Sequence, residues 1–416
     1  MNHKTKLQFT LLILAAEIIY TLPFVMIRIF RDTISTAFNI TNQNIGICFT
    51  LYGITALLSY IHGGLIADKY QPKYLMSIAL FLTGIGGFFW VYFPSLETLY
   101  SLYIYWGITT VMFFWSPLIK AIRILGEKQH QVTSFSILES GRGIVAGIVG
   151  IIGILVINLI IPDENFTKSI LKSMMNFVYL ITSILIIFIA FLMLLLPDFG
   201  ETSKITSKDS SGTKLLIAFK HPIIWILMVI IFTSYTGYKI TGVFTQYVSE
   251  SYQYSVKEST ILGTVHSFLR FIVCLLIVVF AKKATPSKWL IISYCIMAIG
   301  SLILIFNQQY YNISLILSIT IPAIGVYALR GLYFTLLEEA KVPIQITGTM
   351  VGIISIVAYS PELFIGQIEG FFLDELDGTN GFKYLFVLLF LCAIIGLICS
   401  ILFHQTNKQK NEYLST

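Results

Sequence analysis

The sequence predicts an all-α polytopic membrane protein, with twelve transmembrane helices in two six-helix bundles. Its 416 residues are 56% hydrophobic and only 12% charged, and the mean hydropathy is +0.83. A water-soluble globule of this composition would have too little polar surface. The apolar residues gather in twelve runs of about 20 residues, the length that crosses a bilayer core. A single long polar segment separates the first six runs from the last six.

The twelve runs give the expected positions of the helices. They cover residues 7–30, 43–66, 74–93, 99–122, 134–160, 174–196, 222–247, 260–281, 288–306, 312–337, 347–372 and 382–403. Residues 197–221 are polar and rich in Ser, Thr and Gly, which is the composition of a linker. We therefore expect an amino-terminal bundle over 1–196, a linker over 197–221 and a carboxyl-terminal bundle with a short tail over 222–416.

The basic residues indicate how the chain is oriented. Lysines and arginines gather before the first run, in the linker, after the last run and in the loop that holds Lys69 and Lys73. Cytoplasmic loops of membrane proteins carry an excess of these residues. We expect a multi-pass protein of the inner membrane, with both termini and the linker on the cytoplasmic side.

The loop between the second and third runs carries a charged motif. Gly64, Asp68, Lys69 and Lys73 fit the pattern Gly-x-x-x-Asp-(Arg/Lys)-x-Gly-x-(Arg/Lys), and Gln71 stands where the pattern has its second glycine. This pattern is the signature of the major facilitator superfamily between its second and third helices, and the chain resembles that family. The resemblance implies that Asp68 docks against the positive end of a neighbouring helix and acts as a gating latch. The alternative is a solvated, positively charged turn.

The resemblance covers nearly the whole chain and implies a secondary active transporter. In this family the two halves rock around a central site near the bilayer midplane, which is alternating access. The first, fourth, seventh and tenth helices generally line the cavity. Three of these four carry a proline here, namely Pro23, Pro117 and Pro322. Such prolines permit bending where a water-filled cavity satisfies the freed carbonyl groups.

Ionisable residues inside the apolar runs are functional candidates, because their burial costs several kcal/mol unless they are paired or hydrated. Arg270 is expected to bind an anionic substrate, since a guanidinium grips a carboxylate or phosphate with two hydrogen bonds. The alternative for Arg270 is an ion pair with Glu17 or Glu362. Lys239 is expected to be a second ligand, and its competing role is to reach out to the membrane surface.

Two further sets of charges have structural alternatives. Glu139 and Arg142 are three residues apart and share a helix face, so we expect a structural or gating pair, with substrate contact second. Arg330 lies near the cytoplasmic end of its run. A gating contact there with Glu338 or Glu339 competes with substrate binding.

Glu17 and Glu362 are carboxyl groups in strongly apolar runs, where loss of hydration favours the protonated form. We expect them to couple transport to protons, against the alternative of neutral acids bonded to neighbouring helices. Tyr20 and Tyr238 lie on helices expected to face the cavity, where they can stack on a substrate or bond its hydroxyl groups. Interfacial anchoring is the competing role of such tyrosines.

The excess of bases in the helices favours an anionic solute, such as a sugar acid, a sugar phosphate or a carboxylate. The chain loosely resembles the organophosphate and nitrate-porter branches of the superfamily, and transport is expected to be proton-coupled or by exchange. An exporter of drugs or metabolites, or a membrane sensor that does not transport, is the alternative.

The remaining expectations concern partners. The sequence has no Ser/His/Asp set, metal-ligand spacing or phosphate-cradling glycine loop, and its five cysteines form no CxxC pair. We expect no enzymatic activity, cofactor or metal. The expected partners are a small anionic solute, protons or a counter-substrate, and the lipid bilayer. We expect a monomer that binds no nucleic acid.

Overall fold

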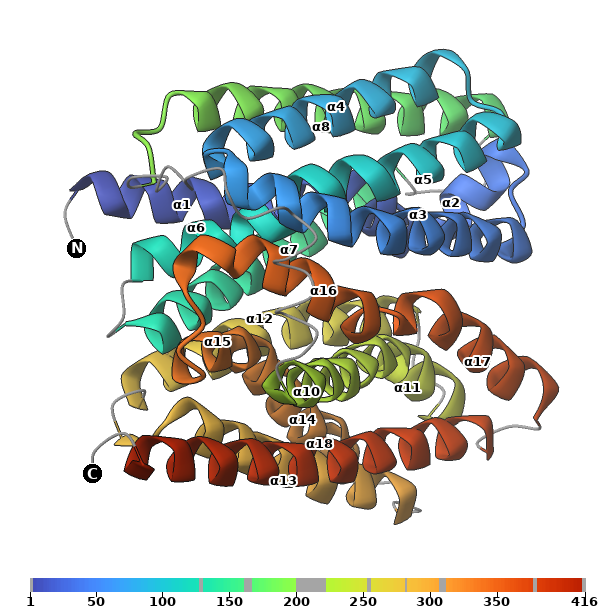
Figure 1. Cartoon of the computed structure of the whole chain (residues 1–416). Helices are drawn as coiled ribbons and strands as arrows, with labels where there is room; N and C mark the ends of the chain where they lie inside the picture. The colour runs from blue at the N-terminus through green and yellow to red at the C-terminus, as the bar shows by residue number, and fades with distance from the viewer. Residues whose placement is uncertain are drawn as a thin grey trace. The chain divides into compact units, whose positions relative to one another are not determined.

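The computed structural model describes residues 3–126, 130–160, 167–199, 222–252, 256–280, 283–306, 312–376 and 380–413. All regular elements in these residues are helices (Figure 1). The helices of the first half of the sequence are α1 (His3–Ile18), α2 (Met26–Phe38), α3 (Asn42–Lys69), α4 (Pro72–Tyr92), α5 (Leu96–Thr110), α6 (Ser116–Gly126), α7 (Gln131–Ile160) and α8 (Lys168–Leu194). Those of the second half are α10 (Pro222–Ile240), α11 (Phe244–Tyr252), α12 (Val256–Phe280), α13 (Pro286–Phe306), α14 (Asn312–Leu332), α15 (Leu336–Glu339), α16 (Thr347–Ala358), α17 (Pro361–Glu375) and α18 (Asn380–Tyr413).

The chain divides into two compact units, and each unit draws on both halves of the sequence. Unit 1 comprises Met1–Leu125, Val145–Leu215 and Ile344–Ile356, and unit 2 comprises Gly126–Ile144, Leu216–Pro343 and Val357–Thr416. The first part of α7 therefore belongs to unit 2, whereas most of α16 belongs to unit 1.

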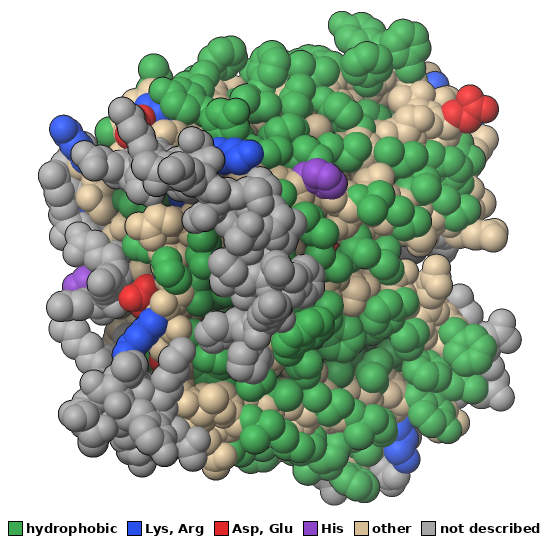
Figure 2. Space-filling view, in the orientation of Figure 1, with side chains coloured by type: hydrophobic (Ala, Val, Ile, Leu, Met, Phe, Trp, Pro, Cys, Tyr) green, Lys and Arg blue, Asp and Glu red, His purple; other side chains and the backbone are tan. Residues whose placement is uncertain are grey.

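The prediction of twelve membrane-crossing helices is confirmed. The described residues contain twelve helical spans that are long and apolar enough to cross a membrane. Large apolar side chains such as Leu58, Phe188 and Ile299 are exposed, and apolar side chains dominate the coloured surface of the face drawn in Figure 2. Exposure on this scale would be costly in water but suits contact with lipid. The apolar surface therefore faces the membrane.

Within each unit, long helices pack side by side. In unit 1, α4 lies along α8 and α3 lies along α5; in unit 2, α13 lies along α14 and α18 (Figure 1). Close approach in unit 2 depends on small residues, because a Cβ atom added at Gly300 of α13 would lie 2.5 Å from the Pro322 ring of α14. Small residues at the contact are how membrane helices gain packing energy.

The span Ile344–Leu373 is broken between α16 and α17. Four other spans are interrupted by a π-turn or a 3₁₀-turn. These spans are Lys4–Val25, Leu96–Gly126, Ile223–Val248 and Ser314–Glu339. The interruptions are π-turns at Thr21–Val25 and Val111–Trp115, and 3₁₀-turns at Thr241–Val243 and Tyr333–Thr335. They fall in the first, fourth, seventh and tenth of the twelve spans. Both kinds of turn leave backbone groups outside the regular ladder and mark places where a helix can bend.

The first helical stretch is longer than the expected 7–30. After the π-turn, α2 runs to Phe38 with a kink at Phe30, whose φ of −112° and ψ of 26° are not helical. Asn39 ends α2 in the left-handed conformation with φ of 56°. Asparagine tolerates this conformation because its short polar side chain bonds locally. The additional turns carry polar residues, so hydropathy alone did not include them.

Candidate functional site

The charged motif forms a tight turn whose acid caps another helix. Helix α3 ends at Lys69, and Pro72 is the first residue of α4, where a proline costs no hydrogen bond. The Asp68 carboxylate accepts bonds from the backbone N–H groups of Gly348 (2.7 Å) and Thr349 (2.9 Å), and from the Thr349 hydroxyl (2.5 Å). These residues form the first turn of α16, the positive end of the helix dipole. Asp68 is buried, so the alternative of a solvated turn does not describe it.

The motif glycine explains how Asp68 reaches α16. A Cβ atom at Gly64 would lie 2.5 Å from the Gly348 carbonyl oxygen, and one at Gly348 would lie 2.6 Å from the Gly64 carbonyl oxygen. Gly352 lies on the same face of α16, where its own Cβ atom would come 3.1 Å from the Gly64 Cα atom. Glycines four residues apart let two helix backbones approach closely. The Gly-x-x-x-Asp spacing therefore brings the backbones together and positions the carboxylate.

Basic residues around the motif have separate partners. Lys73 forms an ion pair with Asp198 (2.6 Å) and bonds the Leu196 carbonyl, whereas Lys69 is exposed. Lys120 donates to the Ala67 carbonyl at the end of α3 (2.7 Å).

Arg123 is fully buried in α6 and bonds the Thr347 hydroxyl at the start of α16 (2.5 Å). The expected helix 99–122 ends two residues after Lys120 and one residue before Arg123. The structure places both inside helix α6, where they pack beside the motif.

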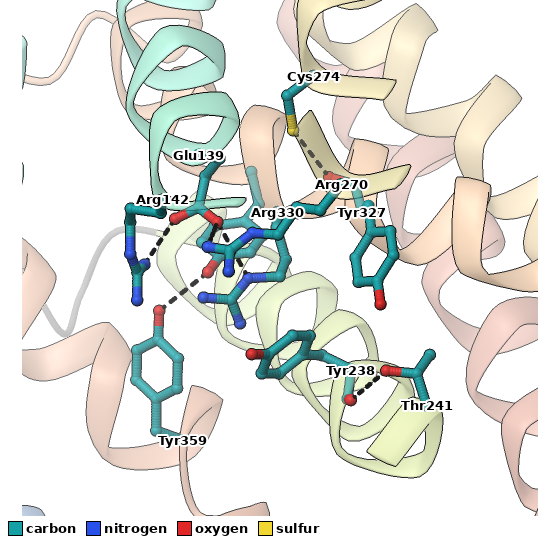
Figure 3. A network of polar contacts seen from close by, with 10 residues as sticks. Glu139, Arg142, Tyr238, Thr241, Arg270, Cys274, Tyr327, Arg330 and Tyr359 are labelled. Atoms are coloured by element: carbon teal, nitrogen blue, oxygen red, sulfur yellow. Dashed lines mark hydrogen bonds and ion pairs between the residues drawn. The ribbon is translucent and has the colours of Figure 1, made fainter. Parts of the chain in front are cut away.

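A cluster of three arginines around one carboxylate lies in unit 2, and we call it the arginine cluster. Glu139 of α7 accepts from Arg142 Nη1 through its Oε1 atom (2.8 Å). Its Oε2 atom accepts from Arg270 Nη2 and from Arg330 Nε (3.2 Å). Figure 3 shows the Glu139 carboxylate flanked by Arg142 on one side and by Arg270 and Arg330 on the other. Of these three contacts, the sequence predicted only the one between Glu139 and Arg142. Its alternatives had paired Arg270 with Glu17 or Glu362, and Arg330 with Glu338 or Glu339.

The arginine cluster carries an excess of two positive charges, since three guanidinium groups share one carboxylate. Glu139, Arg142, Arg270 and Arg330 are only 4–6% exposed. Two buried donors, Arg270 Nε and Arg330 Nη1, have no hydrogen-bond partner among the described residues. Buried guanidinium donors without a partner are expensive in a membrane protein, which makes the cluster a candidate anion site.

Tyrosine side chains surround Arg330. The Arg330 guanidinium carbon lies 3.9 Å from the centre of the Tyr238 ring, a cation–π contact (Figure 3). The hydroxyl groups of Tyr333 and Tyr359 are 3.2 Å apart, and both rings act electrostatically on Arg330. The site therefore combines guanidinium donors with aromatic faces and hydroxyl groups. Tyr333 and Tyr359 were not predicted, because their contacts depend on the tertiary structure.

A second charged group, which we call the lysine cluster, joins α10 to α17. Lys239 Nζ lies 3.0 Å from Glu362 Oε1, and the Tyr235 hydroxyl donates to Glu362 Oε2 (2.5 Å). Glu369 is two turns further along α17 and interacts electrostatically with both Lys239 and Glu362. Its Oε1 atom is buried and has no hydrogen-bond partner in the described part of the chain. Sequence reasoning missed Glu369, although its seven-residue spacing from Glu362 puts both on one helix face.

Glu17 and Tyr20 lie in unit 1. Glu17 is in the last turn of α1, and Tyr20 lies between α1 and the π-turn at Thr21–Val25. Both are half-buried, and they directly precede the π-turn that contains Pro23. The Pro23 carbonyl accepts a bond from the Tyr103 hydroxyl (2.5 Å), which satisfies a backbone group at this break. The π-turn thus places an acid and an aromatic ring beside an irregular stretch of backbone, as is common at functional sites.

Comparison with protein families identifies the type of protein. The model of the Major Facilitator Superfamily matches residues 13–366. The inner membrane protein YqcE of Escherichia coli K12 is 25% identical over 357 residues, which is 84% of this chain and 83% of that protein.

Solved structures agree on the fold. A variant of the E. coli fucose:proton symporter FucP superposes with a TM-score of 0.76 at 14% identity, over 96% of this chain and 99% of that one. The proton:xylose symporter XylE, bound to 6-bromo-6-deoxy-D-glucose, gives a TM-score of 0.76 at 14% identity, over 95% and 94% of the two chains. At these identities the similarity shows the shared fold.

Proposed function

Because the chain belongs to the Major Facilitator Superfamily and is a multi-pass inner membrane protein, we propose that it transports a small organic anion by alternating access. The observation that carries this proposal is the arginine cluster, with its excess of two positive charges and its two unpartnered buried donors. Such a site gains more from an anion than from a neutral or cationic solute.

The charge of the cluster narrows the class of anion. A phosphate monoester carries close to two negative charges at neutral pH and would neutralise the excess, whereas a monocarboxylate would leave one positive charge. Aromatic rings and hydroxyl groups beside Arg330 suit the ring and hydroxyl groups of a sugar. The fold shared with a fucose:proton symporter and a xylose symporter is consistent with such a solute. A sugar phosphate is thus the preferred substrate class, with sugar acids second.

The contacts support the proposed site assignment. Arg270 and Arg330 bind the anionic group, and Tyr238 contacts the remainder of the solute. Lys239, which the sequence suggested as the second ligand, bonds Glu362, so we give its place to Arg330. Tyr20 keeps its proposed role as a substrate contact.

Transport is proposed to be coupled to protons or to a counter-substrate. Glu17 and Glu362 are the coupling carboxyl groups. The buried Oε1 atom of Glu369 supports giving this residue a coupling role as well. A carboxyl group held in apolar surroundings takes up a proton on one side and releases it on the other.

The same proposal covers the organisation of the chain. The two six-helix halves are 1–196 and 222–416, and both termini face the cytoplasm with the linker 197–221. Residues 200–221 of this linker lie outside the described residues. Asp68 of α3, bonded to the first turn of α16, would hold the cytoplasmic side closed in one state of the transport cycle.

Uptake by purified protein in proteoliposomes tests the proposal. The panel is glucose 6-phosphate, glucuronate, glycerol 3-phosphate and neutral glucose, each with and without a pH gradient. We expect saturable uptake of at least one anion and none of glucose. Arg270→Ala should abolish this uptake, whereas Lys172→Gln, which removes an exposed basic residue of α8, should leave it unchanged.

Two results would contradict parts of the proposal. Anion uptake that survives both Arg270→Ala and Arg330→Ala would rule out the arginine cluster as the substrate site. Uptake that is indifferent to the pH gradient would remove the coupling role of Glu17 and Glu362 and leave exchange as the mode of transport.

A further inference from the structure

Glu139 uses both of its carboxylate oxygens on the guanidinium groups that a substrate anion would need. Its Oε2 atom accepts from both Arg270 and Arg330, and its Oε1 atom accepts from Arg142. Among the described residues, Glu139 forms ion pairs with these three arginines, and Tyr333 interacts with it electrostatically. With three cations around it, this carboxylate stays ionised.

Glu139 uses only one of the two donors on the edge of Arg270 that binds anions best. Nη2 and Nε lie on one edge of the group, the edge that binds a carboxylate or phosphate with two parallel hydrogen bonds. Glu139 takes Nη2, and Nε is buried without a partner in the described structure. Arg330 also has an unused donor. Its Nε donates to Glu139, while its Nη1 has no partner among the described residues. Glu139 therefore satisfies the two arginines incompletely.

Arg142 explains how Glu139 could move aside without being left unpaired. It lies three residues along the same helix, so its bond to Oε1 of 2.8 Å is local to α7. The bonds to Arg270 of α12 and Arg330 of α14 connect different helices. A rotation of the Glu139 side chain toward Arg142 would keep one ion pair and free both interhelical donors.

We propose that Glu139 is a tethered counter-ion, which occupies Arg270 and Arg330 in the empty site and is displaced toward Arg142 when the substrate anion binds. This inference rests on the proposed function and adds a role for Glu139 as an internal competitor that lowers the affinity of the site. A transporter must release its substrate, and a carboxylate that returns to the vacated guanidinium groups lowers the cost of the empty state.

Anion binding to Glu139→Gln tests the inference, because the variant removes the competing charge and keeps the shape of the side chain. Glucose 6-phosphate and inorganic phosphate are titrated into purified protein by calorimetry. We expect the Kd of Glu139→Gln to be at least about tenfold lower than that of the wild type. Glu139→Asp, whose shorter side chain reaches Arg270 and Arg330 less well, should fall between the two.

The matched control is Glu339→Gln. It removes an acid from the same unit, where Glu339 accepts from the Ser287 backbone N–H (2.9 Å) and hydroxyl (2.6 Å) at the start of α13. Its Kd should equal that of the wild type. Thermal unfolding supplies a second readout: without an anion Glu139→Gln should unfold at a lower temperature, and glucose 6-phosphate should raise its Tm more than it raises the wild-type Tm.

The outcomes separate this inference from the proposed function. If the wild type binds an anion while Glu139→Gln and Glu139→Asp bind it equally well or more weakly, Glu139 is a structural support and the inference is overturned. If the wild type binds none of the anions in the panel, the proposed function itself fails.

Discussion

At the scale of single residues, Asp68 makes the most completely satisfied contact of the charged motif. Its buried carboxylate accepts three hydrogen bonds from Gly348 and Thr349. A hydrogen bond to an ionised group is stronger than one between neutral groups. A buried group that loses its partner also costs free energy, because water does not replace the lost bond. The contact therefore contributes to the stability of α16 and of its packing on α3.

Asp68→Asn should lower the stability of the protein by about 1–3 kcal/mol, because the amide cannot accept all three bonds and carries no charge for the helix dipole. The thermal unfolding midpoint in detergent micelles measures the effect. Asp198→Asn is the control, since Asp198 pairs with Lys73 but its side chain is 55% exposed. Exposed ion pairs contribute about 0–1 kcal/mol. Equal midpoints for the two variants would contradict the capping role.

The sequence predicted which residues are functional candidates better than it predicted their partners. Arg270, Arg330, Glu139 and Arg142 stood out because charges are rare in apolar helices. Only the Glu139–Arg142 pair was foreseen, since its three-residue spacing is local to one helix. The bonds from Arg270 and Arg330 to Glu139 span 131 and 191 residues of sequence. Such pairing depends on which helices become neighbours, and one sequence does not contain that information in a local pattern.

At the scale of helices, the approach of α3 to α16 depends on glycine. A Cβ atom at Gly64 would lie 2.5 Å from the Gly348 carbonyl oxygen, closer than two such atoms pack. The backbone oxygen cannot move aside as the end of a flexible side chain does. The two helices would have to separate, which would also lengthen the bonds of Asp68 to the first turn of α16.

Gly64→Ala should therefore destabilise the protein by about 1–3 kcal/mol, the usual cost of overpacking. Gly46→Ala is a matched control in the same helix, because a Cβ atom at Gly46 meets nothing within 4 Å. Alanine there should leave the stability unchanged or raise it by up to about 1 kcal/mol through helix propensity. Unfolding midpoints of the two variants check the prediction, which fails if Gly64→Ala is as stable as Gly46→Ala.

Only some of the helix interruptions are predictable from the sequence. Pro23 lies inside the first π-turn, and Pro117 follows the second, at Val111–Trp115. A proline removes a backbone donor and so predicts such a break. The 3₁₀-turns at Thr241–Val243 and Tyr333–Thr335 contain no proline. The sequence predicted bending at Pro23, Pro117 and Pro322, so it predicted none at Thr241–Val243 and placed the bend of the tenth span at Pro322, inside α14.

At the scale of the whole molecule, the number of spans was predictable because the bilayer sets one length for every helix. The composition of the two compact units was not. The first part of α7 groups with unit 2, and residues 344–356 group with unit 1. These groupings follow from specific contacts, such as Glu139 with Arg270 and Asp68 with Gly348. Hydropathy does not distinguish one helix neighbour from another.

Proton coupling involves the whole transport cycle. We expect the two charged clusters to have different roles in it. The arginine cluster has excess positive charge and suits an anion, whereas the lysine cluster has two carboxyl groups for one lysine. If both Glu362 and Glu369 were ionised, that group would carry one uncompensated negative charge inside the membrane. One proton would remove this charge, so we expect the lysine cluster to hold the coupling proton.

Glu369→Gln should therefore keep the exchange of anion across the membrane but lose accumulation driven by a pH gradient. Exchange only requires the loaded carrier to reorient, whereas accumulation requires a proton to bind and leave in every cycle. Counterflow and gradient-driven uptake of the transported anion, measured in the same proteoliposomes, give the two rates. Glu97→Gln, which changes an exposed acid in the first turn of α5, should preserve both. Loss of counterflow together with accumulation in Glu369→Gln would instead assign this residue to substrate binding or folding, and unchanged accumulation would exclude it from coupling.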